Sequence, residues 1–207
     1  MKLFRVVLPL CLSCIGGAGV IYAQSFDVAA GAGTALAPAR ATPIDSFGDG
    51  NLYYGPKLDG AFGKISGDLM LRPSFGVGAE YSFRFSQGDY AGLNYRPSFY
   101  DVNAIFAPRL HTSRIQPEFQ AGLGGMNLRF YYPQSQCDSF AGCSNSNNFI
   151  ESSNHLQVHG LAGIRFYVTP GVFIRPEAEV HWVHNLFQFG SAYVSQYGVS
   201  VGYSFGR

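Results

Sequence analysis

The 207-residue sequence has few features of helical or nucleic-acid-binding proteins. After residue 23, no apolar stretch approaches the roughly 20 residues that a membrane-spanning helix requires. Lys and Arg number 14 against 13 Asp and Glu, with no basic stripe, so the sequence predicts no nucleic-acid partner. Helical periodicity with caps is missing, and 26 glycines with 15% aromatic residues argue against a helical bundle.

Residues 1–23 have the pattern of a secretory signal peptide. Lys2 and Arg5 precede the apolar stretch 6–20, and Ala23 supplies a small residue for cleavage. A membrane anchor is the alternative, but the stretch is short and is interrupted by Pro9 and three glycines. A lipoprotein with lipid on Cys14 is a second alternative, which lacks the usual Leu three places upstream. We expect cleavage after Ala23, leaving one domain, 24–207, with a net charge of −1.

Cysteine is scarce, and cleavage would remove Cys11 and Cys14. The remaining pair, Cys137 and Cys143, lies in a stretch rich in Ser and Asn. Because a signal peptide implies an oxidising compartment, the pair is predicted to form a local disulfide, with two free thiols as the alternative.

Residues 75–86 alternate with a period of two, which predicts a β-strand. Aromatic and aliphatic residues share one parity, whereas glycines and charges such as Glu80 and Arg84 share the other. The pattern recurs, and the eight predicted strands are 26–34, 57–71, 75–86, 99–107, 115–132, 155–168, 172–184 and 193–205. Strands of about ten residues with one apolar face are typical of transmembrane barrels.

The predicted connections alternate in length, long after the first, third and fifth strands and short after the second, fourth and sixth, while the outer loop 185–190 is shorter than the other outer loops. The long ones include polar loops at 87–97 and 133–154. In 115–132 the apolar parity changes, which predicts a bulge at Gly124–Gly125, and Pro117 predicts a local irregularity. The predicted fold class is all-β: an eight-stranded antiparallel up-and-down transmembrane β-barrel with both ends on the periplasmic side.

Over residues 24–207 the chain resembles the small outer-membrane β-barrel domain family, the OmpA and OmpX-like barrels. The resemblance is carried by the Pro73 turn before residues 76–81, the Pro170 turn and the last strand, 197–205. It implies location in the outer membrane, contact with outer-membrane lipid, and recognition of the C-terminal strand by the assembly machinery. That strand commonly ends in an aromatic residue, whereas here Phe205 is followed by Gly206 and Arg207.

The alternation predicts a lumen with charges of both signs, which must pair because an eight-stranded barrel is only wide enough for side chains. The predicted lumen charge network comprises Lys64, Asp68, Glu80, Arg84, Asp101, Glu118, Arg165, Arg175, Glu177 and Glu179. A plug is the favoured interpretation, with a gated ion path as the alternative. His155 and His159 share the lumen side with His181 on the next strand, but residues four apart in a strand lie roughly 13 Å apart, so no metal site is predicted.

Catalysis is not predicted. The sequence contains no Gly-x-Ser-x-Gly elbow and no phosphate-cradling loop. A barrel that deacylates lipid would use a His-x-Ser pair near the outer leaflet, whereas His111 and Ser113 fall in a predicted periplasmic turn. We predict a structural or surface-interaction protein without a cofactor, with the loop 133–154 as the candidate for contact with an extracellular ligand. A narrow pore for small solutes and a soluble periplasmic carrier with reversed faces are the alternatives.

Overall fold

The computed structural model describes residues 25–38, 42–45, 48–110, 114–138, 142–185 and 191–206. Residues 1–23 and the pair formed by His111 and Ser113 lie outside these ranges. The signal peptide and the periplasmic turn predicted there therefore stay predictions. Within the described ranges, no helix is long and apolar enough to cross a bilayer.

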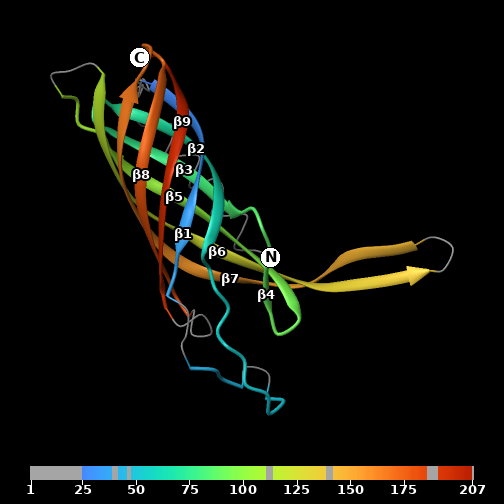
Figure 1. Ribbon diagram of the computed structural model, residues 1–207. Helices are drawn as coiled ribbons and strands as arrows, with labels where there is room; N and C mark the ends of the chain where they lie inside the picture. Colours follow the sequence, from blue (N-terminus) through green and yellow to red (C-terminus); the bar gives the residue numbers. More distant parts are fainter. Residues whose placement is uncertain are drawn as a thin grey trace, which may run out of the picture.

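The described residues form nine antiparallel strands. They are β1 (Ser25–Leu36), β2 (Gly60–Arg72), β3 (Phe75–Arg84), β4 (Gly88–Tyr90), β5 (Leu93–Phe106), β6 (Ile115–Asp138), β7 (Gly142–Tyr167), β8 (Val172–Val183) and β9 (Tyr193–Phe205). Eight of them close into a ring, because β3 pairs with β5 and β1 pairs with β9 (Figure 1). The short β4 pairs only with β5. The predicted eight-stranded up-and-down barrel is confirmed.

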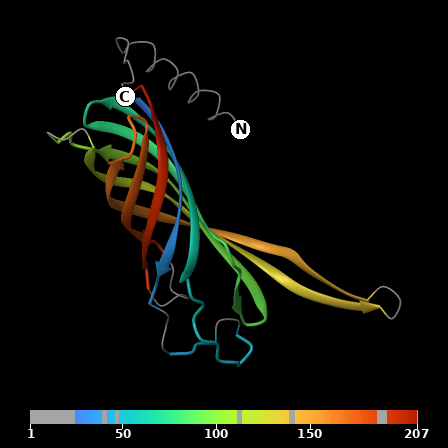
Figure 2. The same cartoon turned by 45° about the horizontal axis from the view of Figure 1, so that its top comes forward.

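The two ends of the barrel differ. The tight turns at 73–74 and 168–171 lie at one end, together with the end of β9. At the opposite end the β1–β2 connection hangs below the ring, and the paired ends of β6 and β7 project far beyond it (Figure 2). By the rule for bacterial outer-membrane barrels, the short-turn end is periplasmic and the other end extracellular.

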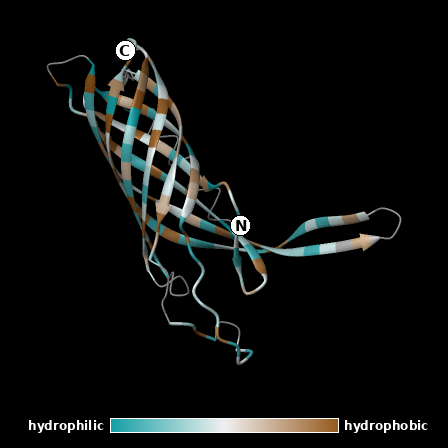
Figure 3. Ribbon diagram, viewed as in Figure 1, coloured by the Kyte–Doolittle hydropathy of each residue, from teal (hydrophilic) through white to brown (hydrophobic). Residues whose placement is uncertain are grey.

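The apolar face points outward. In β3, Phe75 and Val77 are exposed, whereas the alternate residues Gly78 and Glu80 are buried. In β8, Ile174 remains 39% exposed beside the fully buried Arg175. The ribbon accordingly alternates between hydrophobic and hydrophilic colours along the strands (Figure 3). A soluble carrier would show the reverse, so that alternative is wrong.

The bulge predicted at Gly124–Gly125 is absent. The β5–β6 register runs without a shift from Asn94–Tyr131 to Phe106–Phe119. The glycines allow close packing instead, because a Cβ on Gly125 would lie 2.4 Å from the Tyr100 hydroxyl and one on Gly124 would lie 1.9 Å from the Tyr100 carbonyl oxygen. The even-numbered side chains therefore point inward along the whole stretch, and the apolar ones beyond Gly125 fill the lumen.

Two other local predictions are also wrong. The predicted loops 87–97 and 133–154 are largely strand, since they contribute β4, the start of β5, and the outer parts of β6 and β7. The β6–β7 ladder passes Pro117–Ile164 without a shift. Its irregularity lies at Phe130 and Tyr131, which pair with Glu151 and Phe149 and leave Ile150 as an extra residue.

Candidate functional site

The barrel lumen contains a layer of buried charges between two apolar layers. Phe173, Met70 and Ile105 fill the periplasmic end, where Ile105 is 2% exposed. The charged side chains buried in the middle layer are Asp27, Lys64, Asp68, Glu80, Asp101, Glu118, Arg165, Arg175, Glu177 and Glu179. Seven of the eight ring strands contribute to this layer, and β9 adds the hydroxyl of Ser200, which donates to Glu177.

Two arginines on neighbouring strands organise the periplasmic half of the middle layer. Arg165 on β7 pairs with Asp27, with Glu118 and, at 2.8 Å, with Asp68 Oδ2. Arg175 on β8 pairs with Glu118, and its Nε lies 2.6 Å from Glu177 Oε2. Glu118 therefore bridges both guanidinium groups. Because the partners come from β1, β2, β6 and β8, these pairs tie opposite walls of the barrel together.

Lys64 on β2 organises the extracellular half of the middle layer. Its Nζ lies 2.7 Å from Glu177 Oε1 and 3.4 Å from Glu80 Oε2, and it also pairs with Glu179. Glu177 thus contacts both Lys64 and Arg175 and joins the two halves of the layer.

Negative charge is in excess in the middle layer. Among the described residues, seven buried carboxylic acids face three buried cations, Lys64, Arg165 and Arg175. Burying unpaired charge is costly, so the surplus must be met by protons or by mobile cations. The lumen is therefore unfavourable for anions.

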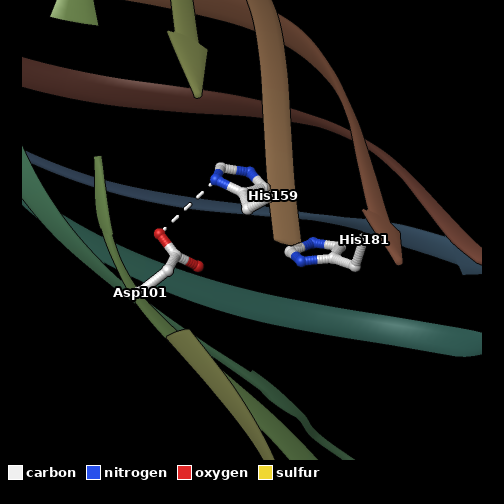
Figure 4. Close-up of side chains that lie close together, drawn as sticks. All are labelled: Asp101, His159 and His181. Atoms are coloured by element: carbon white, nitrogen blue, oxygen red, sulfur yellow. Dashed lines mark ion pairs between the residues drawn. The ribbon is translucent and has the colours of Figure 1, made fainter. Parts of the chain in front are cut away.

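Two histidines lie at the extracellular border of the charged layer. His159 on β7 and His181 on β8 are direct cross-strand partners, and their rings stack with centroids 4.7 Å apart (Figure 4). His159 Nδ1 lies 3.0 Å from Asn103 Oδ1 and 3.4 Å from Asp101 Oδ1, while His181 Nδ1 lies 3.2 Å from Gln157 Oε1. These contacts hold both rings in the lumen.

Asp101, His159 and His181 each bring one ligand atom within 4.8 Å of the others, a donor set of the kind that divalent metals use. The sequence argument compared residues along one strand, whereas this grouping arises between strands. The prediction that the protein binds no metal stays a prediction.

An apolar layer closes the extracellular end of the lumen. Its buried members are Ala35, Leu58, Phe62, Tyr90, Tyr95, Phe99, Met126, Leu128, Val183 and Val194. Leu58 comes from the β1–β2 connection and Tyr90 from β4, so residues outside the ring cover its mouth. Where this layer meets the charges, the cavity beside Phe62, Lys64 and Glu179 measures about 10 Å³, enough for one water molecule.

Arg84 was predicted to belong to the lumen charge network because it alternates with the apolar residues of its strand. In the structure it lies apart from the charged layer. Its guanidinium donates to the Lys57 carbonyl oxygen at 3.2 Å and lies over the Tyr95 ring at 5.7 Å. The strand ends at Arg84, so the side chain reaches the mouth of the barrel. The predicted lumen charge network also omitted Asp27. Its signal in the sequence was its position opposite in parity to Phe26 and Val28, in a strand of otherwise small residues.

Outside the barrel, β6 and β7 continue as a two-stranded ribbon of residues 132–138 and 142–148. Cys137 and Cys143 form a disulfide near its tip, as the sequence predicted. Tyr132, Phe149 and Ile150 are each more than half exposed near its base.

The closed ring, the outward apolar face and the charged lumen define a small eight-stranded β-barrel of the outer-membrane type. Two solved structures share this fold. Neisserial surface protein A is 16% identical, with a TM-score of 0.56, and the match covers 87% of this chain and 97% of that one. OprG from Pseudomonas aeruginosa is 14% identical, with a TM-score of 0.56, and the match covers 89% of this chain and 97% of that one. The sequence matches no protein-family model and no curated protein. OprG is described as an outer membrane protein.

Proposed function

We propose that this protein is a closed outer-membrane barrel with a structural or surface-interaction role and no catalytic activity. The observation that carries the proposal is the filling of the lumen. Ion pairs span the middle layer, an apolar layer covers the mouth, and the cavity between Phe62, Lys64 and Glu179 has room for one water molecule.

Conductance across a planar bilayer tests the closed lumen. The purified barrel should give no steady discrete openings, because an ion would have to cross an apolar layer without hydration. Regular single-channel steps from the unmodified protein would contradict the proposal.

A narrow pore for small solutes is the second candidate function, and the surplus of buried carboxylic acids favours it for cations. Such a pore would show cation-selective openings that increase when Phe99, a 1% exposed member of the apolar layer, is replaced by Ala. Openings that carry anions equally well would exclude this candidate, because the buried charge disfavours them.

The surface-interaction role is assigned to the ribbon. It combines exposed aromatic side chains at its base with Asn and Ser along its length, a mixture that offers contact area and hydrogen bonds together. Seven residue pairs extend it by roughly 24 Å from the barrel.

Cells that display the barrel with and without the ribbon provide the test for an extracellular ligand. We expect binding to an array of immobilised glycans and matrix proteins to disappear when residues 133–147 are replaced by a two-residue turn, while the heat-induced mobility shift of the barrel remains. Equal binding by both chains would contradict the role of the ribbon.

The proposal also includes delivery by the outer-membrane assembly machinery through β9. Phe205 is 51% exposed and stacks on Phe26 with ring centroids 6.1 Å apart, so its ring lies on the outer surface where another protein can reach it. Phe205→Ala should reduce the amount of folded barrel in cells, whereas Tyr197→Ala in the middle of the same strand serves as the control. Equal amounts of the two variants would contradict recognition at Phe205.

A further inference from the structure

A groove on the outer surface of the barrel contains two arginines. It is lined by Tyr81 and Phe83 from β3, Arg96 and Ser98 from β5, and Arg129 and Tyr131 from β6, and its volume is about 240 Å³. We propose that this arginine groove binds the phosphorylated headgroup of an outer-leaflet lipid.

The two arginines face each other without a counter-charge. Arg96 and Arg129 are direct partners in the β5–β6 register, and both are exposed. Side chains in such positions have Cβ atoms about 5 Å apart, and like charges there are destabilising. Among the described residues, neither guanidinium forms an ion pair with a carboxylate. An anion between them would turn repulsion into attraction on both sides.

Hydrogen bonds already orient one of the guanidinium groups. Arg129 Nε donates to Asn127 Oδ1 at 3.0 Å, and Asn127 Nδ2 donates to Asn154 Oδ1 at 2.8 Å. These hydrogen bonds use Nε of Arg129 and leave its two terminal nitrogens for a ligand. Arginine presents such nitrogens in a fork that matches phosphate oxygens.

The height of the groove matches the lipid headgroups. The Phe106 ring lies tilted against the Phe75 ring, with centroids 5.0 Å apart, and marks the aromatic border at the short-turn end. Arg96 lies ten residues further along β5, which spans roughly 33 Å of strand, or roughly 25 Å of height at a tilt of about 40°. The apolar band of such barrels is also about 25 Å tall. The arginines therefore lie just beyond the hydrocarbon on the extracellular side.

The walls of the groove select a lipid over a free anion. Tyr81 is 38% exposed, and its ring lies 5.8 Å from that of Phe83 between centroids. Further along the outer face, Val102 and Leu123 are 66% and 63% exposed and pair across β5 and β6. An acyl chain can follow this apolar surface while its phosphate contacts the arginines, whereas inorganic phosphate would gain only the second contact.

The test compares heat-induced mobility shifts of the full barrel in detergent micelles doped with lipid A, with dephosphorylated lipid A, or with inorganic phosphate at the same concentration. At 100 times the dissociation constant, lipid A should raise the transition by roughly 5 to 10 °C relative to the dephosphorylated lipid. Inorganic phosphate should give a much smaller rise. An equal rise with dephosphorylated lipid A or with inorganic phosphate would overturn the proposal.

Variants locate the effect. Arg96→Gln/Arg129→Gln should abolish the lipid A rise, and in undoped detergent it should be at least as stable as the unmodified barrel because the repulsion is gone. The matched control Arg72→Gln/Arg109→Gln removes two exposed arginines at the opposite end and should keep the rise. If the double variant fails to fold, Arg129→Gln alone should lose most of the rise. A full rise in either groove variant would overturn the assignment.

Discussion

The charged middle layer and the apolar extracellular layer fill one barrel in two different ways. In the middle layer, Arg175 is fully buried and has specific partners on β6 and β8. In the apolar layer, Phe99 is buried to the same degree but packs on Phe62 and on the His181 ring. Ion pairs require one register of the strands, whereas apolar packing is non-directional and admits Leu58 and Tyr90 from outside the ring. The comparison indicates that directional ion pairs fix the register of the strands, whereas apolar packing fills the mouth of the barrel.

Removing a buried cation from the middle layer should lower the stability of the barrel more than any other change considered. Arg175→Leu leaves Glu118 and Glu177 short of a buried partner, which we expect to cost roughly 3 to 5 kcal/mol of unfolding free energy. The temperature of the mobility shift in detergent measures the loss. Arg109→Leu, which changes an exposed arginine, is the control. An unchanged transition in Arg175→Leu would show that the middle layer does not specify the fold.

Truncation in the apolar layer should have the next largest effect. Phe99→Ala removes a ring whose centroid lies 5.9 Å from that of Phe62, and we expect a loss of about 3 kcal/mol together with increased conductance. Phe106→Ala on the lipid side of the same strand should leave conductance at its original value. Increased conductance in both variants would contradict a seal at Phe99.

Two carboxylates of the middle layer sharpen the comparison. Glu118 contacts both buried arginines, whereas Glu80 contacts Lys64 at no less than 3.4 Å, and Lys64 keeps two closer partners. Glu118→Gln should cost about 2 kcal/mol, while Glu80→Gln should change stability by about 0.5 kcal/mol or less because acid is in surplus. Denaturant titration of both variants measures the difference. Equal losses would mean that the carboxylates are not in surplus.

The disulfide should matter least to the barrel. Cys137→Ser/Cys143→Ser changes the tip of the ribbon, which is remote from both lumen layers, so the mobility shift should stay in place. Limited proteolysis should cut the ribbon faster, because its end is no longer fastened. A lowered barrel transition would indicate that the ribbon supports the ring.

Alternation along the chain was sufficient to predict the parts of the eight ring strands that cross the hydrocarbon, because outward positions at that depth must be apolar. It failed at 126–130, since an apolar side chain looks the same whether it faces lipid or a dry lumen. The polar residues at the intervening positions, Asn127 and Arg129, were the available signal that the outer surface had already left the hydrocarbon. The pairing of His159 with His181 depends on the register between two strands, which no single strand encodes.

The pairing of β1 with β9 makes the two ends of the domain neighbours in space. The ring therefore cannot close before β9 is in place. Every earlier intermediate has two strand edges with unpaired backbone groups, and strands of other chains can pair with them. A folding catalyst that covers both edges until β9 pairs with β1 would protect the chain at the stage when these edges are exposed.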